Sequence, residues 1–484
     1  MNSIKKNFIY NSVLTISGYL FPLITYPYVS RVLGVSNIGI CNFVDSIINY
    51  FTLFSMMGIS AIGMRVISQN RDDRKEMSRH FTGLLVLNLI TTTLAIVALL
   101  VSMYTVEKLF PYRDLLYIGV CKLFFNFFLI EWFYAGVEDF KYITKRSLVV
   151  RSLFVVAVFV LIQDADDYKT YYLLSAFIYL LNGIINIFYC RKYVDFTISG
   201  IRIKPYVTTF LTIGFYMLIT NIYTSLNVTW LGFATNADEV GYYTTATKLY
   251  TIILAMFTAL TNVVYPRVTY LYSKGMQDEF WEKIHTVVDM VFAISIPIVI
   301  VLMVFSPDLI HLLAGEGYEG AYTPFRIIAP LVLIVGYEQV LVIQILMATK
   351  HDRQITINSV IGATVSILMN LIMISRFGAV GTAFVWVFTE LTIAFLSLKD
   401  VHKFTPYRFP ALLFLKNILF YIPLFIVLLT FKEFMALPSI ISLSIAGILT
   451  LLYSLYIQTR WLKSQIILQT LDSLHRRITT YIKK

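Results

Sequence analysis

Long apolar runs separated by short polar segments occupy most of the chain. A helix needs about 20 mostly apolar residues to cross the hydrocarbon core of a bilayer. Segments of about that length occur at residues 8–30, 40–64, 81–104, 114–136, 147–163, 170–190, 207–231, 241–265, 284–306, 324–347, 355–375, 381–398, 412–431 and 439–459. The pattern predicts an all-α polytopic membrane protein with about fourteen transmembrane helices.

The longest connection on the basic side, residues 190–207, follows the sixth predicted helix. It separates two six-helix halves, and each half opens with a hairpin that carries a Leu-Gly pair and a later glycine, "RVLGVSNIGICNF" (31–43) and "TWLGFATNADEVGYY" (229–243). We therefore predict a six-helix lobe at 1–195, a second at 196–400, and two further helices with a basic tail at 401–484. Repeated bundles around a central cavity are typical of transporters.

Composition supports the membrane assignment and changes how the charge is interpreted. The chain is 58% hydrophobic and 14% charged, with a formal net charge of +11, and its mean hydropathy is +0.74. If the N-terminus, alternate loops and the C-terminal tail share one side, that side holds 29 of the 39 Lys and Arg residues. The positive-inside rule places that side in the cytoplasm, with both termini. The basic charge thus indicates orientation, and we predict no nucleic-acid partner.

No arrangement of residues suited to catalysis is found in the sequence. The six histidines are scattered without metal-ligand spacing, and no Walker A motif is present. The three cysteines lie far apart and are interpreted as packing residues. A membrane polymerase or ligase is expected to carry a large outer loop, whereas the longest one here, residues 307–323, is short. We predict no enzyme, no metal site and no cofactor other than a coupling cation.

Ionisable residues inside membrane helices are costly, and they usually face a cavity or a partner. Asp45 and Lys248 are candidates for a functional or gating role, with a static ion pair as the alternative. Lys122 is a third candidate, although a lysine near a helix end can also reach lipid headgroups. A coupling-ion role, for a proton or sodium, is considered for three acidic residues, and a structural hydrogen bond is the alternative for each: Asp289, Glu338 and Glu390.

Polar residues also gather next to Lys248, at the start of the predicted eighth helix. Tyr242 and Thr245 belong to the stretch "YYTTATK", which suits a hydrated cavity that contacts sugar hydroxyls and phosphate. The C-terminal stretch "SQIILQTLDSLHRRITTYIKK" (464–484) is typical of a basic amphipathic helix at a membrane surface.

Four stretches, in this order, resemble the polysaccharide-repeat-unit flippases of bacterial envelopes, which belong to the multidrug/oligosaccharidyl-lipid/polysaccharide exporter superfamily. They are "YPYVSRVLGVSNIGICNF" (26–43), "EWFYAGVEDFKYITKRSLVVR" (131–151), "ADEVGYYTTATKLY" (237–250) and "RFGAVGTAFVWVFTE" (376–390). The resemblance covers nearly the whole chain, and the second stretch is the most specific. It implies fourteen helices in two lobes and transport of undecaprenyl-pyrophosphate-linked oligosaccharide from the inner to the outer leaflet of the bacterial inner membrane.

The resemblance also implies roles for individual residues. In related lipid II flippases one basic residue follows the first helix and another lies in the eighth, so Arg31 and Lys248 are expected near the substrate. Lys122 is added to the candidate substrate-binding residues because it is a cation within a predicted span. A pyrophosphate in hydrocarbon requires cations, because an unpaired charge there costs several kcal/mol or more. We expect Asp45 to hold Lys248 across the two lobes when substrate is absent; pairing of Asp45 within its own lobe, for example with Arg31, is the alternative.

These expectations define a flippase that works by alternating access, for O-antigen, capsule or a related glycan. Its expected partners are the lipid-linked substrate, membrane lipids, and the polysaccharide polymerase and chain-length machinery. A multidrug/cation antiporter of the same superfamily is the first alternative, and it would require a mainly acidic cavity. A membrane glycan polymerase or ligase is the second.

Overall fold

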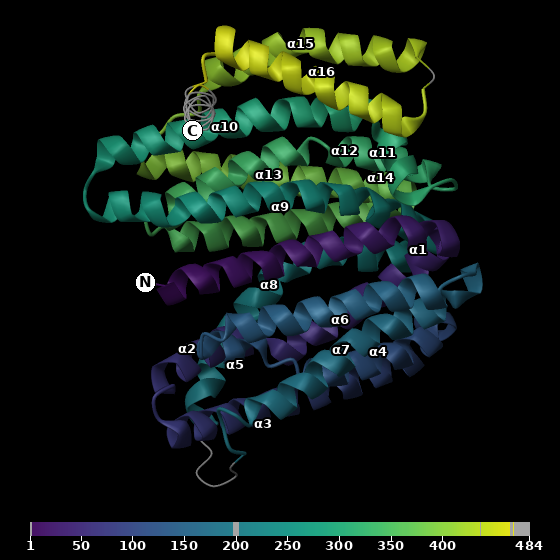
Figure 1. The fold of residues 1–484 in the computed structure, drawn as a ribbon, viewed down its shortest axis with the longest axis vertical. Coiled ribbons are helices and arrows are strands. Elements are labelled where there is room, and N and C mark those ends of the chain that lie inside the picture. Colours follow the sequence, from purple (N-terminus) through teal and green to yellow (C-terminus); the bar gives the residue numbers. More distant parts are fainter. Residues whose placement is uncertain (1, 197–202, 436, 465–467, 469–484) are drawn as a thin grey trace, which may run out of the picture. The chain divides into compact units, whose positions relative to one another are not determined.

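The computed structural model describes residues 2–196, 203–435, 437–464 and 468, and these residues form helices joined by short turns (Figure 1). They divide into two compact units, Met1–Gly241 and Tyr242–Lys484. The helices that begin in the first unit are α1 (Asn2–Met56), α2 (Ile59–Asn70), α3 (Arg74–Thr105), α4 (Arg113–Asn126), α5 (Glu131–Gly136), α6 (Phe140–Leu161), α7 (Tyr168–Cys190), α8 (Lys204–Ala234) and α9 (Ala237–Ser273). Helix α9 continues into the second unit.

The second unit contains most of α9 and the helices that follow it. These are α10 (Gln277–Val304), α11 (Ser306–Ala314), α12 (Tyr322–Ile328), α13 (Leu331–Gln339), a π-helical segment η4 (Val340–Met347), α14 (Asp352–Phe404), α15 (Ala411–Phe434) and α16 (Ser439–Arg460). The 3₁₀ segments of the chain are η1 (Glu107–Tyr112), η2 (Ala165–Asp167) and η3 (Glu319–Ala321). The predicted amphipathic helix at 464–484 lies almost entirely outside the described residues.

The chain reverses direction inside α1, at Gly34. This glycine has φ 75° and ψ 170°, a conformation that a side chain would strain. Tyr28 and Asn37, on either side of it, donate hydrogen bonds to the carbonyls of Ile162 (2.7 Å) and Ala165 (2.8 Å), which lie close together in sequence. The two halves of α1 therefore run away from one end of the bundle and form the first two predicted spans, joined by a single residue rather than by a loop.

A second reversal lies in α14, at Gly378 (φ 52°). The two halves pack against each other, since Asn358 donates to Asp400 at 2.9 Å and a Cβ on Gly362 would meet Ile393. The expected eleventh and twelfth spans are thus the two arms of one hairpin. Hydrophobic runs located both arms, but they gave no indication that the turn would be so tight.

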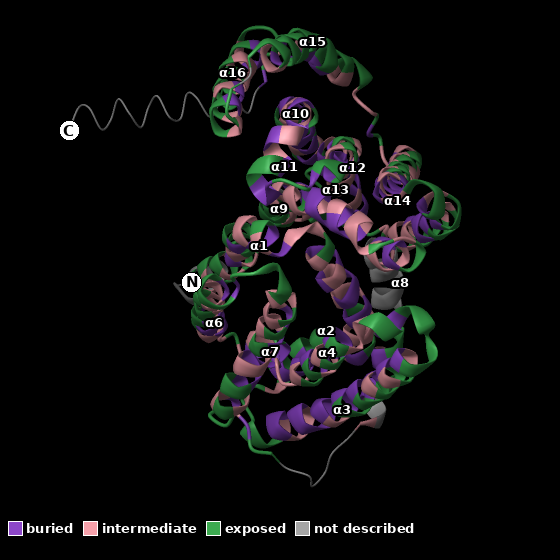
Figure 2. Ribbon diagram, turned by 90° about the vertical axis from the view of Figure 1, so that its right-hand side faces the viewer, coloured by how far each residue is buried: buried purple, intermediate pink, exposed green. Residues whose placement is uncertain are grey.

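Ten helical stretches among the described residues are long and apolar enough to cross a membrane, and two of them contain the reversals at Gly34 and Gly378. Helix α6 falls outside this set, and its 22 residues carry basic side chains at Lys141, Lys145 and Arg146. Large apolar side chains of α15 and α16 are exposed (green in Figure 2), including Phe434 and Ile448. Such exposure is unfavourable in water and costs nothing against lipid.

The core of the first unit is aromatic. Phe81, Trp132, Phe133 and Tyr134 are 3% exposed or less and belong to one hydrophobic cluster. In this unit α8 packs against α1, so the compact unit extends to Gly241. The boundaries predicted at 195/196 and 400/401 follow the sequence repeat and remain predictions.

Candidate functional site

Arg31 lies on the last turn of helix before the reversal at Gly34. Its side chain is exposed, and its guanidinium donates to the carbonyl of Pro27 in the same helix. The proline ring at Pro27 does not prevent this contact, because it is the carbonyl oxygen of Pro27 that accepts. The structure therefore places Arg31 at the tip of the first hairpin, as the sequence pattern indicated.

The glycines shared by the two related hairpins mark a close approach of backbone to backbone. A Cβ on Gly39 would lie 1.8 Å from the carbonyl oxygen of Ala237, and one on Gly241 would lie 2.4 Å from the carbonyl oxygen of Val35. Real side chains do not tolerate such distances. Gly39 and Gly241 thus recur for a steric reason: at each of them the backbone of the other hairpin occupies the place of a side chain.

Asp45 and Lys122 form an ion pair within the first unit. The Lys122 side chain is 10% exposed and the Asp45 side chain is 49% exposed. The Lys122 ammonium also lies over the rings of Tyr179 (5.1 Å) and Tyr172 (5.6 Å), and the Tyr172 hydroxyl lies 3.5 Å from Asp45 Oδ1. The cation is therefore enclosed, and its carboxylate partner remains open on one side.

Both residues of this pair lie deep in the bundle. At 1.5 Å per residue, Asp45 is about 16 Å along the helix from Gly34, and Lys122 is about 14 Å from the start of α4. That is about half the thickness of a hydrocarbon core. Lys122 was expected near substrate or headgroups, and Asp45 was expected to pair with Lys248 or Arg31. The structure joins Asp45 to Lys122 within the first unit, and pairing of Asp45 with Lys248 or Arg31 stays a prediction, as does its gating role.

Lys248 lies on α9, about 16 Å along the helix from Ala237. It is half-buried, as is Tyr242, whereas Thr245 is fully buried. Tyr250 lies edge-on to Trp386, with ring centroids 4.9 Å apart. The structure thus places the predicted polar cluster beside the second arm of α14, and the substrate roles of its members stay predictions.

Two acidic residues of the second unit come together beside this region. Glu338, at the end of α13, and Glu390, in α14, lie within hydrogen-bonding reach of each other, and the Trp386 indole donates to Glu390 at 3.0 Å. Glu338 Oε2 is buried and has no hydrogen-bond partner among the described residues. Two carboxylates this close repel when both are ionised, so the pair can hold a proton or a cation. Asp289 lies elsewhere and accepts from Ser464.

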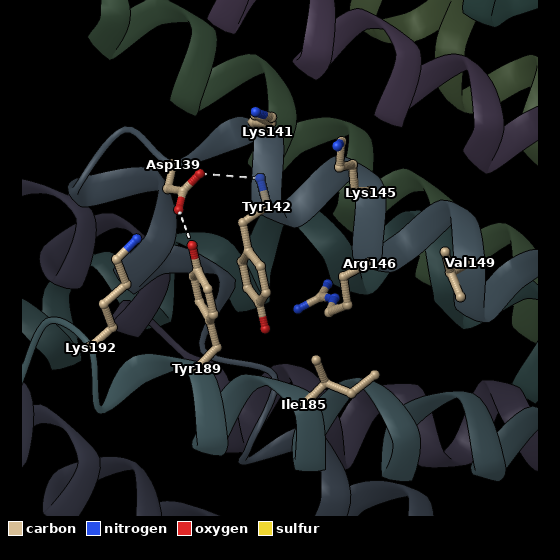
Figure 3. A pocket seen from close by; sticks show the side chains of 9 residues that line it. All are labelled: Asp139, Lys141, Tyr142, Lys145, Arg146, Val149, Ile185, Tyr189 and Lys192. Carbon is tan, nitrogen blue, oxygen red and sulfur yellow. Dashed lines mark hydrogen bonds between the residues drawn. The ribbon is translucent and has the colours of Figure 1, made fainter.

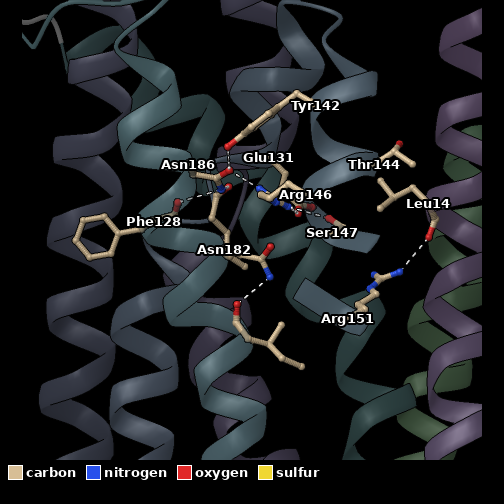
Figure 4. Close-up of polar contacts among 12 residues, drawn as sticks. Leu14, Phe128, Glu131, Tyr142, Thr144, Arg146, Ser147, Arg151, Asn182 and Asn186 are labelled. Atoms are coloured by element: carbon tan, nitrogen blue, oxygen red, sulfur yellow. Dashed lines mark hydrogen bonds and ion pairs between the residues drawn. The ribbon is translucent and has the colours of Figure 1, made fainter. Parts of the chain in front are cut away.

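A pocket of about 570 Å³, not expected from the sequence, lies between the first half of α6 and the second half of α7 (Figure 3). In Figure 3 the rings of Tyr142 and Tyr189 lie side by side; they are stacked with centroids 3.7 Å apart. Below them is a polar network that the sequence analysis also missed (Figure 4).

That network is centred on Arg146, which is 6% exposed. Its guanidinium donates to Glu131, Asn186 and Ser147. Asn186 in turn donates to backbone carbonyls at the break between α4 and α5, where Ile130 has φ 33°. The network supplies partners to backbone groups that the broken helix leaves free.

The Glu131 side chain is 50% exposed although it pairs with the buried Arg146. The available signal was the motif itself, because "EWFYAGVEDFKYITKRSLVVR" contains both charges. Sequence spacing alone could not show that Asn186, 40 residues from Arg146, completes the network.

Comparisons with known proteins agree with this architecture. The profile of the family described as "Polysaccharide biosynthesis protein" matches residues 4–272. A relative named "Putative O-antigen transporter" from Escherichia coli (strain K12) is 22% identical over 409 residues, which cover 83% of this chain and 97% of the relative. A relative from Haloferax volcanii named "Probable low-salt glycan biosynthesis flippase Agl15" is 24% identical over 191 residues, 39% of this chain and 40% of the relative.

Solved structures show the same fold. The lipid II flippase MurJ in an inward closed conformation has a TM-score of 0.75 at 16% identity, covering 93% of this chain and 99% of that one. An inward-facing multidrug resistance MATE family transporter of the MOP superfamily has a TM-score of 0.65 at 12% identity, with 82% and 97% covered. The prediction of an all-α polytopic membrane protein is confirmed. Since the family match spans more than half of the chain, this protein belongs to the polysaccharide biosynthesis protein family.

Proposed function

We propose that the chain is a flippase that moves an undecaprenyl-pyrophosphate-linked oligosaccharide from the inner to the outer leaflet of the bacterial inner membrane by alternating access. The names of its relatives support transport of a glycan. The basic loops favour cytoplasmic placement of both termini. In this proposal the lipid-linked glycan and membrane lipids are its partners, together with the polysaccharide polymerase and chain-length machinery.

The observation that carries the proposal is the Asp45–Lys122 pair. A carboxylate whose side chain is 49% exposed about 16 Å into the bundle cannot face lipid tails, because a charge in hydrocarbon is strongly unfavourable. It therefore faces a hydrated space at mid-membrane depth. Such a space with cations in its wall suits a pyrophosphate attached to a sugar chain.

The same pair suggests how an anionic substrate is handled. A pyrophosphate that enters the hydrated space competes with Asp45 for the Lys122 ammonium, and Arg31 and Lys248 are further candidate cations for the substrate. A ligand shifts a conformational equilibrium only by binding the two states unequally. When the pyrophosphate replaces Asp45 at the Lys122 ammonium, the substrate binds one conformational state more tightly than the other. This exchange would give Asp45 a gating role.

Ion coupling is assigned to the second unit. Glu338 and Glu390 lie together in a buried position, and they hold one proton or one small cation between them. Uptake and release of that ion changes the net charge of the pair, so the pair can couple an ion gradient to the conformational cycle. Asp289 lies apart from this pair and accepts a hydrogen bond from Ser464, so it is the second choice for ion coupling.

Two alternatives differ from this proposal in measurable ways. A multidrug/cation antiporter of the same superfamily would bind organic cations, whereas the deep cations Lys122 and Lys248 disfavour them. A membrane glycan polymerase or ligase would change the length of the glycan rather than its leaflet. No observation on the structure favours either.

The proposal is tested by deleting the gene and analysing undecaprenyl-linked intermediates by mass spectrometry. We expect a single repeat unit on undecaprenyl pyrophosphate to accumulate and to be inaccessible from outside in spheroplasts. The wild-type gene and a Lys169→Ala variant, which breaks only the exposed Lys169–Asp114 pair, should both clear it. Accumulated repeat units exposed on the outer leaflet would point to a polymerase or ligase instead and would overturn the proposal.

A further inference from the structure

The pocket between α6 and α7 is lined by basic side chains at one end of the first unit. Lys141 and Lys145 line it from α6, and Lys192 lines it just beyond the end of α7. Figure 3 shows Lys192 near Asp139 at one end of the pocket, with Val149 and Ile185 toward the other. Two neighbouring helices thus contribute three ammonium groups to the margin of one cavity.

These ammonium groups differ from three neighbouring arginines of the first unit, Arg71, Arg74 and Arg79, each of which is paired with a carboxylate. Lys141, Lys145 and Lys192 form no ion pair within the part of the chain that the structure describes. Lys192 instead lies over the rings of Tyr189 and Tyr193, at 5.4 and 5.3 Å. Their charge is therefore available to an anion that enters the pocket.

The pocket also contains a carboxylate, Asp139, but its oxygens are already engaged. Asp139 caps α6 by accepting from the backbone nitrogen of Tyr142 (3.1 Å), and it accepts from the hydroxyls of Tyr189 (2.9 Å) and Tyr193 (2.8 Å). Burial raises the pKa of the Tyr193 phenol, so this hydroxyl stays a donor. Because three donors hold its charge, Asp139 opposes an incoming anion less than a free carboxylate would.

The apolar end of the pocket continues as an exposed stripe along α6. Side chains at intervals of four, three and four residues are all more than half exposed: Val149, Leu153, Val156 and Val160. Ile185 and Phe188 of α7 are also exposed, at 38% and 66%. In a membrane such a stripe contacts lipid tails. A basic cavity that opens onto an acyl-facing stripe matches a molecule with an anionic head and a hydrocarbon chain.

We infer that this pocket binds the phosphate head of a membrane lipid, with the three lysines around the phosphate and the hydrocarbon chain along the stripe on α6. Basic pockets between transmembrane helices on the cytoplasmic side bind anionic lipid heads in general. The inference rests on the proposed function only for the side of the membrane, which is the cytoplasmic one. Two lipids share this chemistry, a bulk anionic phospholipid and the polyprenyl diphosphate that carries the glycan.

The test measures lipid binding to the full-length purified protein in detergent by native mass spectrometry. Phosphatidylglycerol, undecaprenyl diphosphate and zwitterionic phosphatidylcholine are titrated separately. Each lysine near a phosphate contributes about fivefold to binding. The triple variant Lys141→Gln/Lys145→Gln/Lys192→Gln should therefore bind an anionic lipid at least about tenfold more weakly than the wild-type protein does. Lys75→Gln, which removes an exposed lysine from the same unit outside the pocket, should leave binding unchanged.

Comparison of the two anionic lipids shows which kind of lipid supplies the phosphate that the pocket binds. Tighter binding of undecaprenyl diphosphate makes the pocket a capture site for the carrier lipid, and equal binding makes it a phospholipid site; both support a lipid phosphate. Equal affinity of phosphatidylcholine, or unchanged anionic binding in the triple variant, would overturn the inference. Photocrosslinking of the wild-type protein to a lipid with a reactive head should label residues 139–149 and 185–192, whether or not the variant folds. Since binding needs no transport, a failure here is distinct from a failure of the flippase proposal.

Discussion

Replacing Lys122 with methionine removes the ammonium of the buried pair and keeps a chain of similar length. Breaking a fully buried pair by removing one partner costs roughly 3–5 kcal/mol, whereas an exposed pair contributes about 0.2–1 kcal/mol. The Asp45 side chain that remains is 49% exposed and stays partly hydrated. We therefore expect Lys122→Met to destabilise the protein by about 1.5–3 kcal/mol, between these limits.

The matched control is Lys169→Met, since Lys169 also pairs with an aspartate, Asp114, but both side chains are about half exposed or more. That change should cost at most about 1 kcal/mol. The double variant Asp45→Asn/Lys122→Met leaves no unpaired charge and should recover most of the loss, because a pair replaced by neutral groups is often as stable as the original.

Thermal unfolding of the purified variants in lipid nanodiscs, followed by intrinsic fluorescence, ranks them. The expected order of midpoints is wild type, Lys169→Met, the double variant and then Lys122→Met. The buried pair does not stabilise the bundle as described if Lys122→Met has the same unfolding midpoint as Lys169→Met, or if the midpoint of the double variant is no higher than that of Lys122→Met. If Asp45 instead pairs with Lys248, Lys248→Met and not Lys122→Met should be the variant rescued by Asp45→Asn.

Four further predictions follow from other parts of the structure. Lys248→Ala should abolish surface glycan while leaving the protein in the membrane, as shown by immunoblotting; normal glycan at normal expression would exclude it as a substrate contact. Glu338→Gln and Glu390→Gln should each remove the dependence of transport on the ion gradient in vesicles, and a full response in both would exclude the pair from coupling. Gly39→Val should destabilise by about 1–3 kcal/mol through overpacking, whereas Gly447→Ala, where nothing lies within 4 Å and alanine favours the helix, should melt no lower than wild type. A cysteine at position 200 should be unreactive from outside in intact spheroplasts, and labelling there would reverse the topology.

Hydrophobic periodicity was sufficient for the class of fold, because membrane helices must be long and apolar whatever they pack against. It was less informative about connections. The reversals at Gly34 and Gly378 were predicted as loops, since a single glycine with positive φ leaves no distinctive run of turn residues. The two glycines of the repeat were noticed from the sequence, but their cause is a contact of Gly39 with Ala237 that only the folded chain brings about.

For the candidate site, too, the sequence predicted some features and not others. Charges within apolar runs drew attention to Asp45, Lys122, Glu338 and Glu390, because the cost of burying charge makes each one conspicuous. Which charge pairs with which was not predictable, since partners such as Lys122 and Asp45 are 77 residues apart. Lys192 and the pocket it lines were missed because lysines at helix ends are common, and only packing shows that several converge on one cavity.

Transfer between leaflets by the purified protein is the most direct test of the proposed function. A fluorescent oligosaccharide linked to a polyprenyl pyrophosphate is placed in the inner leaflet of proteoliposomes, and a glycosidase added outside removes the fluorescent sugar only from molecules that reach the outer leaflet. We predict that wild-type protein makes the inner pool accessible, that Lys169→Ala does the same, and that Lys248→Ala and Lys122→Ala leave it protected. Wild-type vesicles whose inner pool stays protected as in protein-free vesicles, under an imposed ion gradient of either sign, would contradict the proposal that this chain is a flippase.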